Sequence, residues 1–148
     1  MSPDSRTKLR NLLVAQESFR QFPYTDTTGH LTIGVGRNLT DRGISTTEAL
    51  TLLDDDIFYF MTKLNYYIPG FTDIDEIRQM VLVSMAFNLG VQGLLEFKGM
   101  LEALQNKNYE KASEEMLDSK AASQDVDRYH ELAYMMKTGE MPACYKLS

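Results

Sequence analysis

Two carboxylates and a hydroxyl lie close together near the start of the chain, in the stretch QESFRQFPYTDTTGHLTIGVGR. A pair of carboxyl groups can cleave a glycosidic bond when one, protonated, donates to the leaving oxygen and the other, ionised, activates water. Glu17, at the expected end of a helix where it can be partly shielded, suits the protonated role. Asp26, in a polar turn, suits the ionised role. We expect Thr32 to hold a water molecule against Asp26.

Glycines follow these residues in the run TIGVG. The alternation over HLTIGVG has a period of two and predicts one strand of a small hairpin. One face of that strand is apolar and the other is almost bare: the apolar face is Leu31, Ile33 and Val35, and the bare face is Thr32, Gly34 and Gly36. Glycine weakens a strand unless something must approach its backbone closely. The bare face therefore predicts room for a ligand, bordered by Gly34 and Gly36.

A helix must position the first carboxylate. The run SPDSRTKLRNLLVAQESF predicts a helix with Ser2 or Ser5 as its N-cap and Glu17 in its last turn. A carboxylate at that end faces the negative pole of the helix dipole, so it is either solvated or held by a cation. Pro23 then interrupts the helical pattern, and DTTGH has the composition of a turn.

A long helix is predicted next, opening with the capping box of Ser45 and Glu48 and running to Pro69. The run DIDEIRQMVLVSMAFNLG predicts a second helix, with Asp73 or Asp75 near its start and Gly90 as its C-cap.

Because this second helix is apolar nearly all round over 80–89, it is expected at the buried centre of a helical lobe. Three amphipathic segments follow, and Gly139 ends the last: GLLEFKGMLEALQNK, YEKASEEMLDSKAA and DVDRYHELAYMMKTGE. The fold class is therefore α+β and mostly helical, with a small hairpin lobe, a long helix and a helical lobe.

Composition argues against several other classes of protein. The formal net charge is −6 and no basic stripe is visible, which disfavours nucleic-acid binding. No apolar run approaches the roughly eighteen residues that span a bilayer, so we expect no stable membrane insertion. The start of the chain is too polar for a secretory signal, and no export signal is expected. With a single cysteine, Cys144, and two histidines, neither an internal disulfide nor a His/Cys metal site is expected, and Cys144 is assigned a structural or incidental role.

These motifs, taken together, resemble the phage-type lysozymes, the T4-lysozyme-like endolysins of glycoside hydrolase family 24. Glu17, Asp26, Thr32 and TIGVG look like the catalytic region of that family. IDEIRQMVLVSMAFNLG resembles its central helix, and FKGMLEALQNKNYEKASEEMLD is similar to the helices after it. DRYHELAYMMKTGE looks like its C-terminal segment, with Arg128 and Glu131 on matching positions. The order holds across nearly the whole chain.

The resemblance implies roles for individual residues. Glu17 matches the general acid, Asp26 the general base, and Thr32 the residue that positions the nucleophilic water. Arg128 matches an arginine that pairs with the catalytic glutamate across the cleft, which would supply the cation expected beside Glu17. Asn88 falls where the family places a polar side chain facing the groove, although a local hydrogen bond near a helix end explains Asn88 about equally well.

The resemblance also implies the domain organisation and the activity of the whole chain. The chain is expected to be a single lysozyme domain over 1–148: a hairpin lobe at about 14–50, a connecting helix at 51–68, and a helical lobe of 1–13 with 69–148. Its expected activity is that of a muramidase, cleaving the β-1,4 bond between N-acetylmuramic acid and N-acetylglucosamine in peptidoglycan with inversion, as a monomer and without cofactor or metal. It would wait in the host cytoplasm until the membrane is opened during phage lysis.

Some features depart from the family pattern. Arg37 follows the glycines where many members carry histidine, Asp127 stands where a basic residue is common, and the chain is acidic where many endolysins are basic. Three alternatives therefore stay open. They are a lysozyme-fold module that binds peptidoglycan without turnover, a lytic transglycosylase that needs only the acid, and a helical interaction protein.

Overall fold

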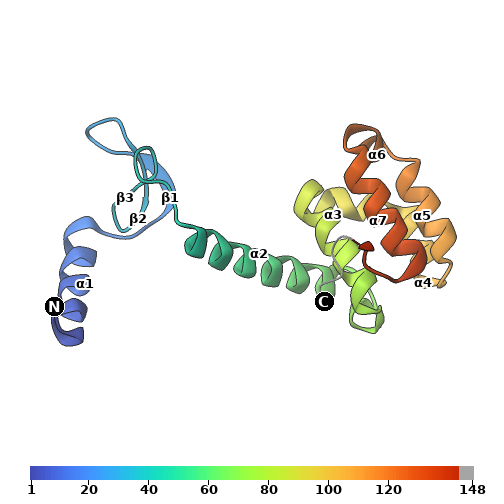
Figure 1. The fold of residues 1–148 in the computed structure, drawn as a ribbon, viewed down its shortest axis with the longest axis horizontal. Coiled ribbons are helices and arrows are strands. Elements are labelled where there is room, and N and C mark those ends of the chain that lie inside the picture. The colour runs from blue at the N-terminus through green and yellow to red at the C-terminus, as the bar shows by residue number, and fades with distance from the viewer. Residues whose placement is uncertain (144–148) are drawn as a thin grey trace. The chain divides into compact units, whose positions relative to one another are not determined.

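A computed structural model describes residues 1–143 of this chain. Cys144, and with it the role assigned to that cysteine, lies outside the described residues. The chain divides into two compact units, Met1–Leu53 and the part from Asp54 onward (Figure 1). The N-terminal unit combines a helix with a small sheet and the C-terminal unit is helical, which confirms the predicted α+β, mostly helical class. The finer lobe boundaries, including the placement of 1–13 with the helical lobe, stay a prediction.

Helix α1 (Pro3–Glu17) forms as its sequence signals require. The Ser2 hydroxyl accepts the Ser5 backbone N–H at 3.1 Å, which satisfies one of the otherwise unpaired first-turn donors. Ser18, with a φ of 65°, leaves the helical conformation and donates its N–H to the Val14 carbonyl. Glu17 is thus the last residue of α1, as predicted. Within its own unit α1 buries none of its residues.

Three short antiparallel strands follow in the order β1 (Arg20–Thr25), β2 (Leu31–Gly34) and β3 (Arg37–Asn38). The predicted strand over TIGVG was too long, because β2 ends at Gly34. Gly34 and Gly36 have φ values of +68° and +67°, so they form the tight connection from β2 to β3. Left-handed φ values are costly for residues with a Cβ, which explains the glycines at these two positions.

The two faces of β2 also differ from the alternation-based expectation. Leu31 and Val35 are 45% and 40% exposed, and Ile33 is half-buried. Thr32, on the face expected to be open, is the buried residue at 3% exposure. Strand periodicity assigns residues to two faces but does not say which face is covered, and here the polar one is covered.

Helix α2 (Thr46–Tyr67) begins with the predicted capping box. The Glu48 N–H donates to the Ser45 hydroxyl at 3.1 Å, and the Ser45 N–H donates to the Glu48 carboxylate at 2.8 Å. The reciprocal pair fixes where the helix starts.

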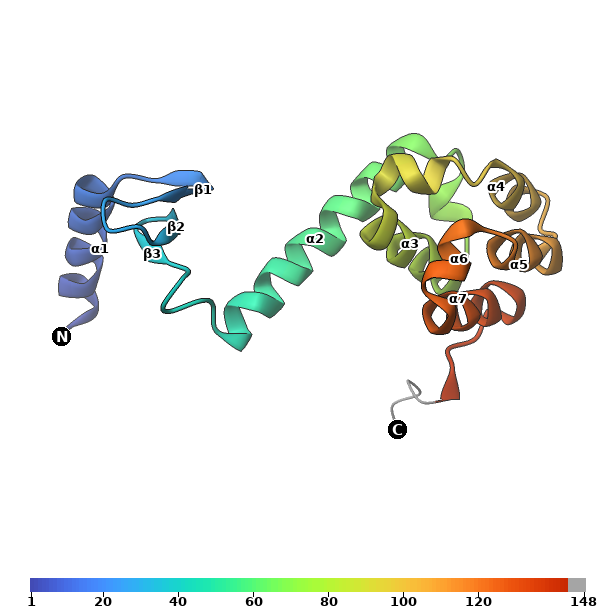
Figure 2. The same ribbon diagram turned by 90° about the horizontal axis from the view of Figure 1, so that it is seen from above.

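The C-terminal unit packs its helices around one apolar core, and Figure 2 shows α5, α6 and α7 side by side. A short 3₁₀ turn (Phe71–Asp73) leads into the helices, which are α3 (Glu76–Leu95), α4 (Lys98–Gln105), α5 (Tyr109–Leu117), α6 (Lys120–Gln124) and α7 (Val126–Thr138). Asp75 is the N-cap of α3, and Gly139 ends α7 in a left-handed conformation; both caps were predicted. Several large side chains in this core are fully buried, among them Leu82, Met85 and Tyr129.

Helix α3 differs from its prediction in two respects. Gly90 is non-helical, with a φ of 76° and a ψ of 163°, but it is a break between two helical segments and not the end of the helix. The stretch that looked apolar all round is buried on one side only. Val81, Leu82, Met85 and Ala86 are buried, whereas Met80 and Phe87 are nearly half exposed.

Within residues 1–143, no single helix is both long and apolar enough to cross a bilayer. Helices α3 and α4, bent by 97° where they join, meet the length and composition test only as a pair, which buried core helices also do.

Candidate active site

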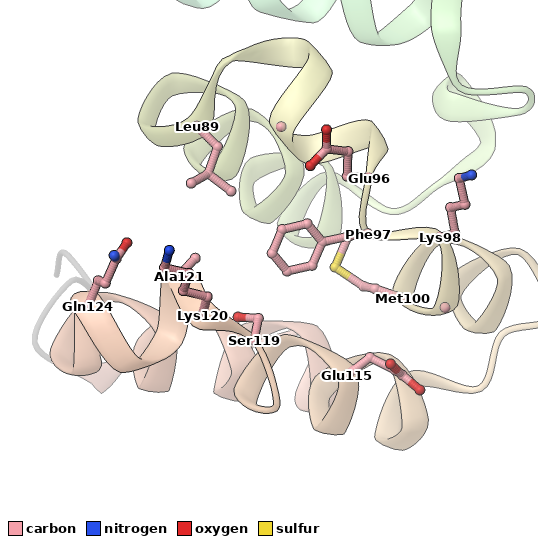
Figure 3. Close-up of a pocket in the computed structure, with 12 residues that line it drawn as sticks. Leu89, Glu96, Phe97, Lys98, Met100, Glu115, Ser119, Lys120, Ala121 and Gln124 are labelled. Atoms are coloured by element: carbon pink, nitrogen blue, oxygen red, sulfur yellow. The ribbon is translucent and has the colours of Figure 1, made fainter.

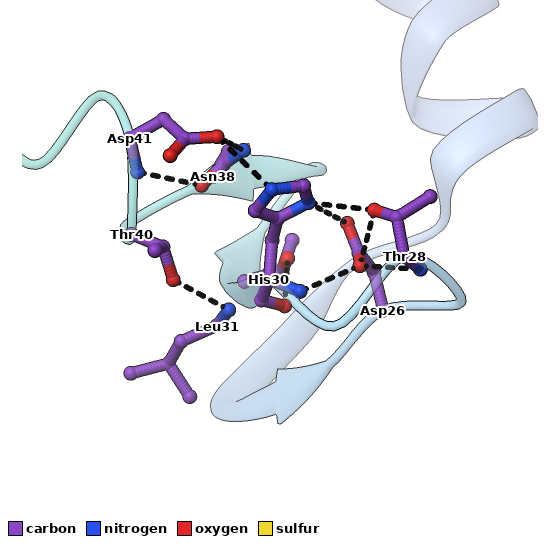
Figure 4. Close-up of polar contacts among 8 residues, drawn as sticks. Asp26, Thr28, His30, Leu31, Asn38, Thr40 and Asp41 are labelled. Atoms are coloured by element: carbon purple, nitrogen blue, oxygen red, sulfur yellow. Dashed lines mark hydrogen bonds and ion pairs between the residues drawn. The ribbon is translucent and has the colours of Figure 1, made fainter.

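Asp26 is held in the turn after β1 by three hydrogen bonds to one of its oxygens (Figure 4). Its Oδ1 accepts the Thr28 N–H at 2.9 Å, the Thr28 hydroxyl at 2.8 Å and the His30 N–H at 2.8 Å. These donors favour the charged form, so they hold the pKa of Asp26 below its ordinary value of 3.8, with the His30 N–H contributing most. Asp26 is therefore ionised at neutral pH, and its Oδ2 accepts no hydrogen bond within the N-terminal unit.

Thr32 is joined to Asp26 through one backbone carbonyl. The His30 carbonyl accepts the Asp26 N–H at 2.9 Å and the Thr32 hydroxyl at 3.0 Å. The hydroxyl proton of Thr32 is committed to that carbonyl, which leaves its oxygen lone pairs as acceptors. A water that donates to Thr32 is the geometry compatible with the predicted role, and the role itself stays a prediction.

Glu17 lies against the connection between β2 and β3. A Cβ added at Gly36 would come within 3.0 Å of Glu17 Oε2, so the absent side chain of Gly36 leaves room for this carboxylate. Around Gly34 nothing lies within 4 Å of an added Cβ. Gly36 thus makes room for the predicted acid, and Gly34 borders open space. Within 1–53 the Glu17 carboxylate makes no hydrogen bond or ion pair.

Arg37, which departs from the family pattern, ties the sheet to the start of α2. Its guanidinium donates to both carboxylate oxygens of Glu48, at 2.7 and 2.5 Å, and to the Gly43 carbonyl at 3.2 Å. This bidentate pair is the main cause that lowers the pKa of Glu48 to about 2, assisted by the Ser45 N–H. The same hydrogen bonds raise the pKa of Arg37.

A hollow of about 780 Å³ lies in the N-terminal unit between the β2–β3 connection and the start of α2. Its lining is mostly apolar and includes Gly34, Gly36 and Arg37 as well as Leu39 and Ile44. Both predicted glycines therefore border a cavity, although neither carboxylate of the predicted pair lines it.

Two further predicted residues lie in the C-terminal unit. Asn88 on α3 accepts the Tyr129 hydroxyl of α7 at 3.1 Å, and burial raises the pKa of that phenol. Arg128 forms an ion pair with Asp125, the N-cap of its own helix, at 3.4 Å. The pairing of Arg128 with Glu17 joins residues of the two units and stays a prediction, as does a groove-facing role for Asn88.

A second hollow, of about 460 Å³, lies within the C-terminal unit (Figure 3). Leu89, Phe97 and Met100 line one side, and Ser119, the N-cap of α6, and Ala121 on α6 lie on the other. No residue predicted as part of the site lines this hollow.

Three residues of the Asp26 network were missed by sequence reasoning. Thr28 and His30 bond Asp26 directly, and Asp41 lies on the far side of the His30 ring, with a carboxylate oxygen 3.1 Å from Nε2. The signal for Thr28 was present, because an Asp followed two residues later by a threonine can form a local turn through its side chain. Nothing local points to Asp41, which reaches the ring only because β3 pairs with β2.

Comparison with known proteins identifies the family of this chain. Residues 14–129 match the family model of phage lysozymes. Three relatives extend the match over nearly all of the chain. Probable T4-type lysozyme 1 of Dictyostelium discoideum is 25% identical over 167 aligned positions, which cover 93% of this chain and 98% of that protein. Probable T4-type lysozyme 2 of the same organism is 21% identical, with 91% of this chain and 96% of that protein covered.

The third relative is the pre-baseplate central spike protein Gp5 of Enterobacteria phage T4. It is 27% identical over 90% of this chain but only 28% of its own length, so the similarity is confined to one part of the spike protein. Because the family match covers most of the sequence and agrees with the α+β fold, the resemblance inferred from the motifs is confirmed. This chain belongs to the phage lysozyme family and is a peptidoglycan hydrolase of the lysozyme type.

Proposed function

We propose that this protein is a muramidase, which hydrolyses the β-1,4 bond between N-acetylmuramic acid and N-acetylglucosamine with inversion at the anomeric carbon. Glu17 is the general acid, Asp26 the general base and Thr32 the residue that positions the attacking water. The observation that carries the proposal is the state of Asp26, a carboxylate saturated at Oδ1 and without a hydrogen bond at Oδ2 within its unit.

A general base needs an ionised oxygen in a fixed direction. The three donors on Oδ1 supply both, since they stabilise the anion and lock the carboxylate plane. Oδ2 then remains to take a proton from water. Inversion requires such a water between base and sugar, whereas a retaining enzyme would use the second carboxylate as a nucleophile.

Glu17 supports the acid role by its position. It ends α1, where the helix dipole opposes a negative charge, and it lies over Gly36, where a side chain would displace it. Both features fix where the carboxyl group lies, at the end of α1 and against the β2–β3 connection.

Product analysis of purified peptidoglycan tests the proposal. The wild type should release reducing muropeptides, and NMR of the fresh product should show the α-anomer formed from the β-linkage. Glu17→Gln and Asp26→Asn should each lower kcat by about a hundredfold or more, the range for loss of general acid or base catalysis. Asp4→Asn, a surface carboxylate of the same helix, is the matched control and should leave kcat unchanged.

Other products would identify the alternatives. Anhydro-muropeptides, with activity retained in Asp26→Asn, would make the protein a lytic transglycosylase. Binding of peptidoglycan by a folded wild type that releases no product would make it a binding module.

We further propose that the enzyme serves lysis of a bacterial host, acting on the wall after it passes from the cytoplasm through an opened membrane. The support is the similarity to phage endolysins. Expression in bacteria tests it. Lysis should follow only when a membrane-permeabilising agent is added, and lysis without that agent would contradict this route.

A further inference from the structure

The His30 ring lies between two carboxylates in the N-terminal unit (Figure 4). On one side Nδ1 is 2.6 Å from the Thr28 hydroxyl and 3.6 Å from Asp26 Oδ2. On the other side Nε2 is 3.1 Å from Asp41 Oδ2. Asp26 and Asp41 are the charged groups within ion-pair distance of the ring among residues 1–53.

The charge of the His30 ring follows from which of the contacting atoms can donate a proton. The Thr28 hydroxyl has one proton, and its 2.8 Å contact with the ionised Asp26 Oδ1 consumes it. In the 2.6 Å contact with Nδ1 the hydroxyl oxygen must therefore accept, so Nδ1 carries a proton. Asp41 is a carboxylate that can only accept, so Nε2 carries a proton as well. All contacts are satisfied together only by an imidazolium.

A neutral ring leaves one short contact unsatisfied. If Nδ1 loses its proton, the Thr28 hydroxyl can donate to Nδ1 or to Asp26 but not to both. Either the third hydrogen bond on Asp26 Oδ1 is lost, or two lone pairs face each other at 2.6 Å. The other neutral tautomer keeps the proton on Nδ1 and preserves the Thr28 contact, but it loses the hydrogen bond from Nε2 to Asp41. Every neutral form of the ring therefore breaks one contact in the series that runs from Asp41 through His30 to Thr28 and Asp26.

Asp41 is itself fixed, so it can hold the ring in place. The Asn38 side-chain amide donates to Asp41 Oδ2 at 3.0 Å, and the Asp41 N–H donates back to the Asn38 side-chain oxygen at 3.0 Å. Because β3 carries Asn38, the sheet sets the distance between Asp41 and the ring.

We propose that His30 is a positioning residue for the reaction, which in its protonated form, tied to Asp41, fixes Thr28 and Asp26 and directs Asp26 Oδ2 toward the attacking water. This inference rests on the proposed function, because it requires Asp26 to be the base. Only the charged ring satisfies every contact, so the positioning is lost once rising pH removes the second ring proton.

The ratio of wild-type kcat to that of His30→Gln, measured against pH, tests this role. Glutamine keeps hydrogen-bonding groups but cannot carry the charge. The ratio should be about tenfold or more at pH 5, the effect of a lost charge-assisted hydrogen bond, and should fall toward one as pH rises, while KM stays unchanged. A purely structural role would give a ratio that does not vary with pH, and that result would overturn the proposal.

A second variant and a spectroscopic readout guard against misfolding of His30→Gln. Asp41→Asn removes the anion on the far side of the ring, so the pH at which kcat changes should move downward. NMR of ¹⁵N-labelled wild type should show both His30 nitrogens protonated at pH 5, and a neutral ring there would contradict the proposal. His130→Gln, which changes the other histidine, is the control and should leave the pH profile unchanged.

These outcomes are separable from failure of the proposed function. An inactive wild type, or an active Asp26→Asn, would reject the muramidase mechanism. An active wild type with an inactive Asp26→Asn and a pH-independent His30→Gln ratio would reject only the role of His30.

Discussion

At the scale of single residues, Asp26 shows how a short turn can fix the orientation and the charge of a carboxylate. The same donors that hold the anion in one orientation also make it a weaker base, since they lower its pKa. If Asp26 is the base, as proposed, its orientation is gained at some loss of basicity. The acidic limb of the activity profile should report this pKa directly.

Removing one donor should move that limb. Thr28→Ala deletes the hydroxyl that bonds Asp26 Oδ1, so the pKa of Asp26 should rise toward 3.8. Because a raised pKa means that the base becomes protonated at higher pH, the acidic limb of kcat should shift upward in pH. Thr28→Ser keeps the hydroxyl and should retain the wild-type limb. The measurement is kcat from pH 2.5 to 6, together with NMR titration of the Asp26 carboxyl carbon; coincident limbs in Thr28→Ala and wild type would contradict the assignment.

At the scale of elements, the β2–β3 connection performs two tasks with two glycines. Both need a left-handed backbone, but only Gly36 lies under the Glu17 carboxylate. The absence of a side chain at Gly36 therefore allows the end of α1 to lie against the β2–β3 connection.

Gly36→Ala should reduce activity more than its backbone strain explains. The new Cβ meets Glu17 Oε2 at 3.0 Å, so the acid must shift. Gly43→Ala is the matched control, since its φ of +62° gives similar strain and nothing lies within 4 Å of its Cβ. Each should lose about 1 kcal/mol of stability from the left-handed conformation. In kinetic assays, only Gly36→Ala should show a lower kcat, and equal kcat values in the two variants would argue against the contact.

The Arg37–Glu48 pair joins the sheet to α2 and should make stability depend on pH. Glu48 has a pKa of about 2 in the folded protein and an ordinary value of 4.5, so its stabilising contribution is fully present above about pH 4.5. This contribution is lost as pH falls toward 2, where Glu48 becomes protonated in the folded protein as well.

Glu48→Gln measures this contribution. The difference in thermal unfolding midpoint between wild type and Glu48→Gln should be constant from pH 7 to about 4.5 and should shrink as pH falls to 2. Glu102→Gln is a control, because Glu102 forms no ion pair among residues 1–143, and its difference should be smaller at pH 7. If the difference in unfolding midpoint between wild type and Glu48→Gln is the same at pH 2 as at pH 7, the pair with Arg37 does not lower the pKa of Glu48.

At the scale of the whole molecule, the apolar core is distributed unequally. The buried apolar side chains among residues 1–143 all lie between Leu64 and Met136. Buried apolar area is the main favourable contribution to folding. The C-terminal unit is therefore expected to be much more stable in isolation than the N-terminal unit.

Two fragments test this distribution. A fragment of residues 45–148, which keeps the capping box of α2, should be helical and should unfold cooperatively in urea. A fragment of residues 1–44 should have little ordered structure, because short helices and small sheets without a core are marginal in water. Circular dichroism of both fragments provides the measurement, and a cooperative transition in 1–44 alone would contradict the expectation.

The sequence by itself determined the features whose causes lie within a few residues. The helix start at Ser45 and the end at Gly139 were predicted, and Ser2 and Asp75 were each one of two predicted candidates, because a cap needs only a side chain and the backbone of the next turn. The fold class followed from the order of the predicted elements, and the family was recognised from the resemblance of the motifs around Glu17, Asp26 and Thr32 and of the later helices.

Only the tertiary structure decided the features that depend on segments distant in sequence. Alternation could not show that Thr32 would be buried and Leu31 exposed, since the covered face of a strand is set by what packs against it. Glu17 meets Gly36, and His30 meets Asp41, only after the chain has folded back on itself. The physical reason is range: capping, periodicity and the hydrogen bonds on Asp26 are satisfied within a few residues, whereas burial and the contacts between distant side chains depend on neighbours that the fold brings together.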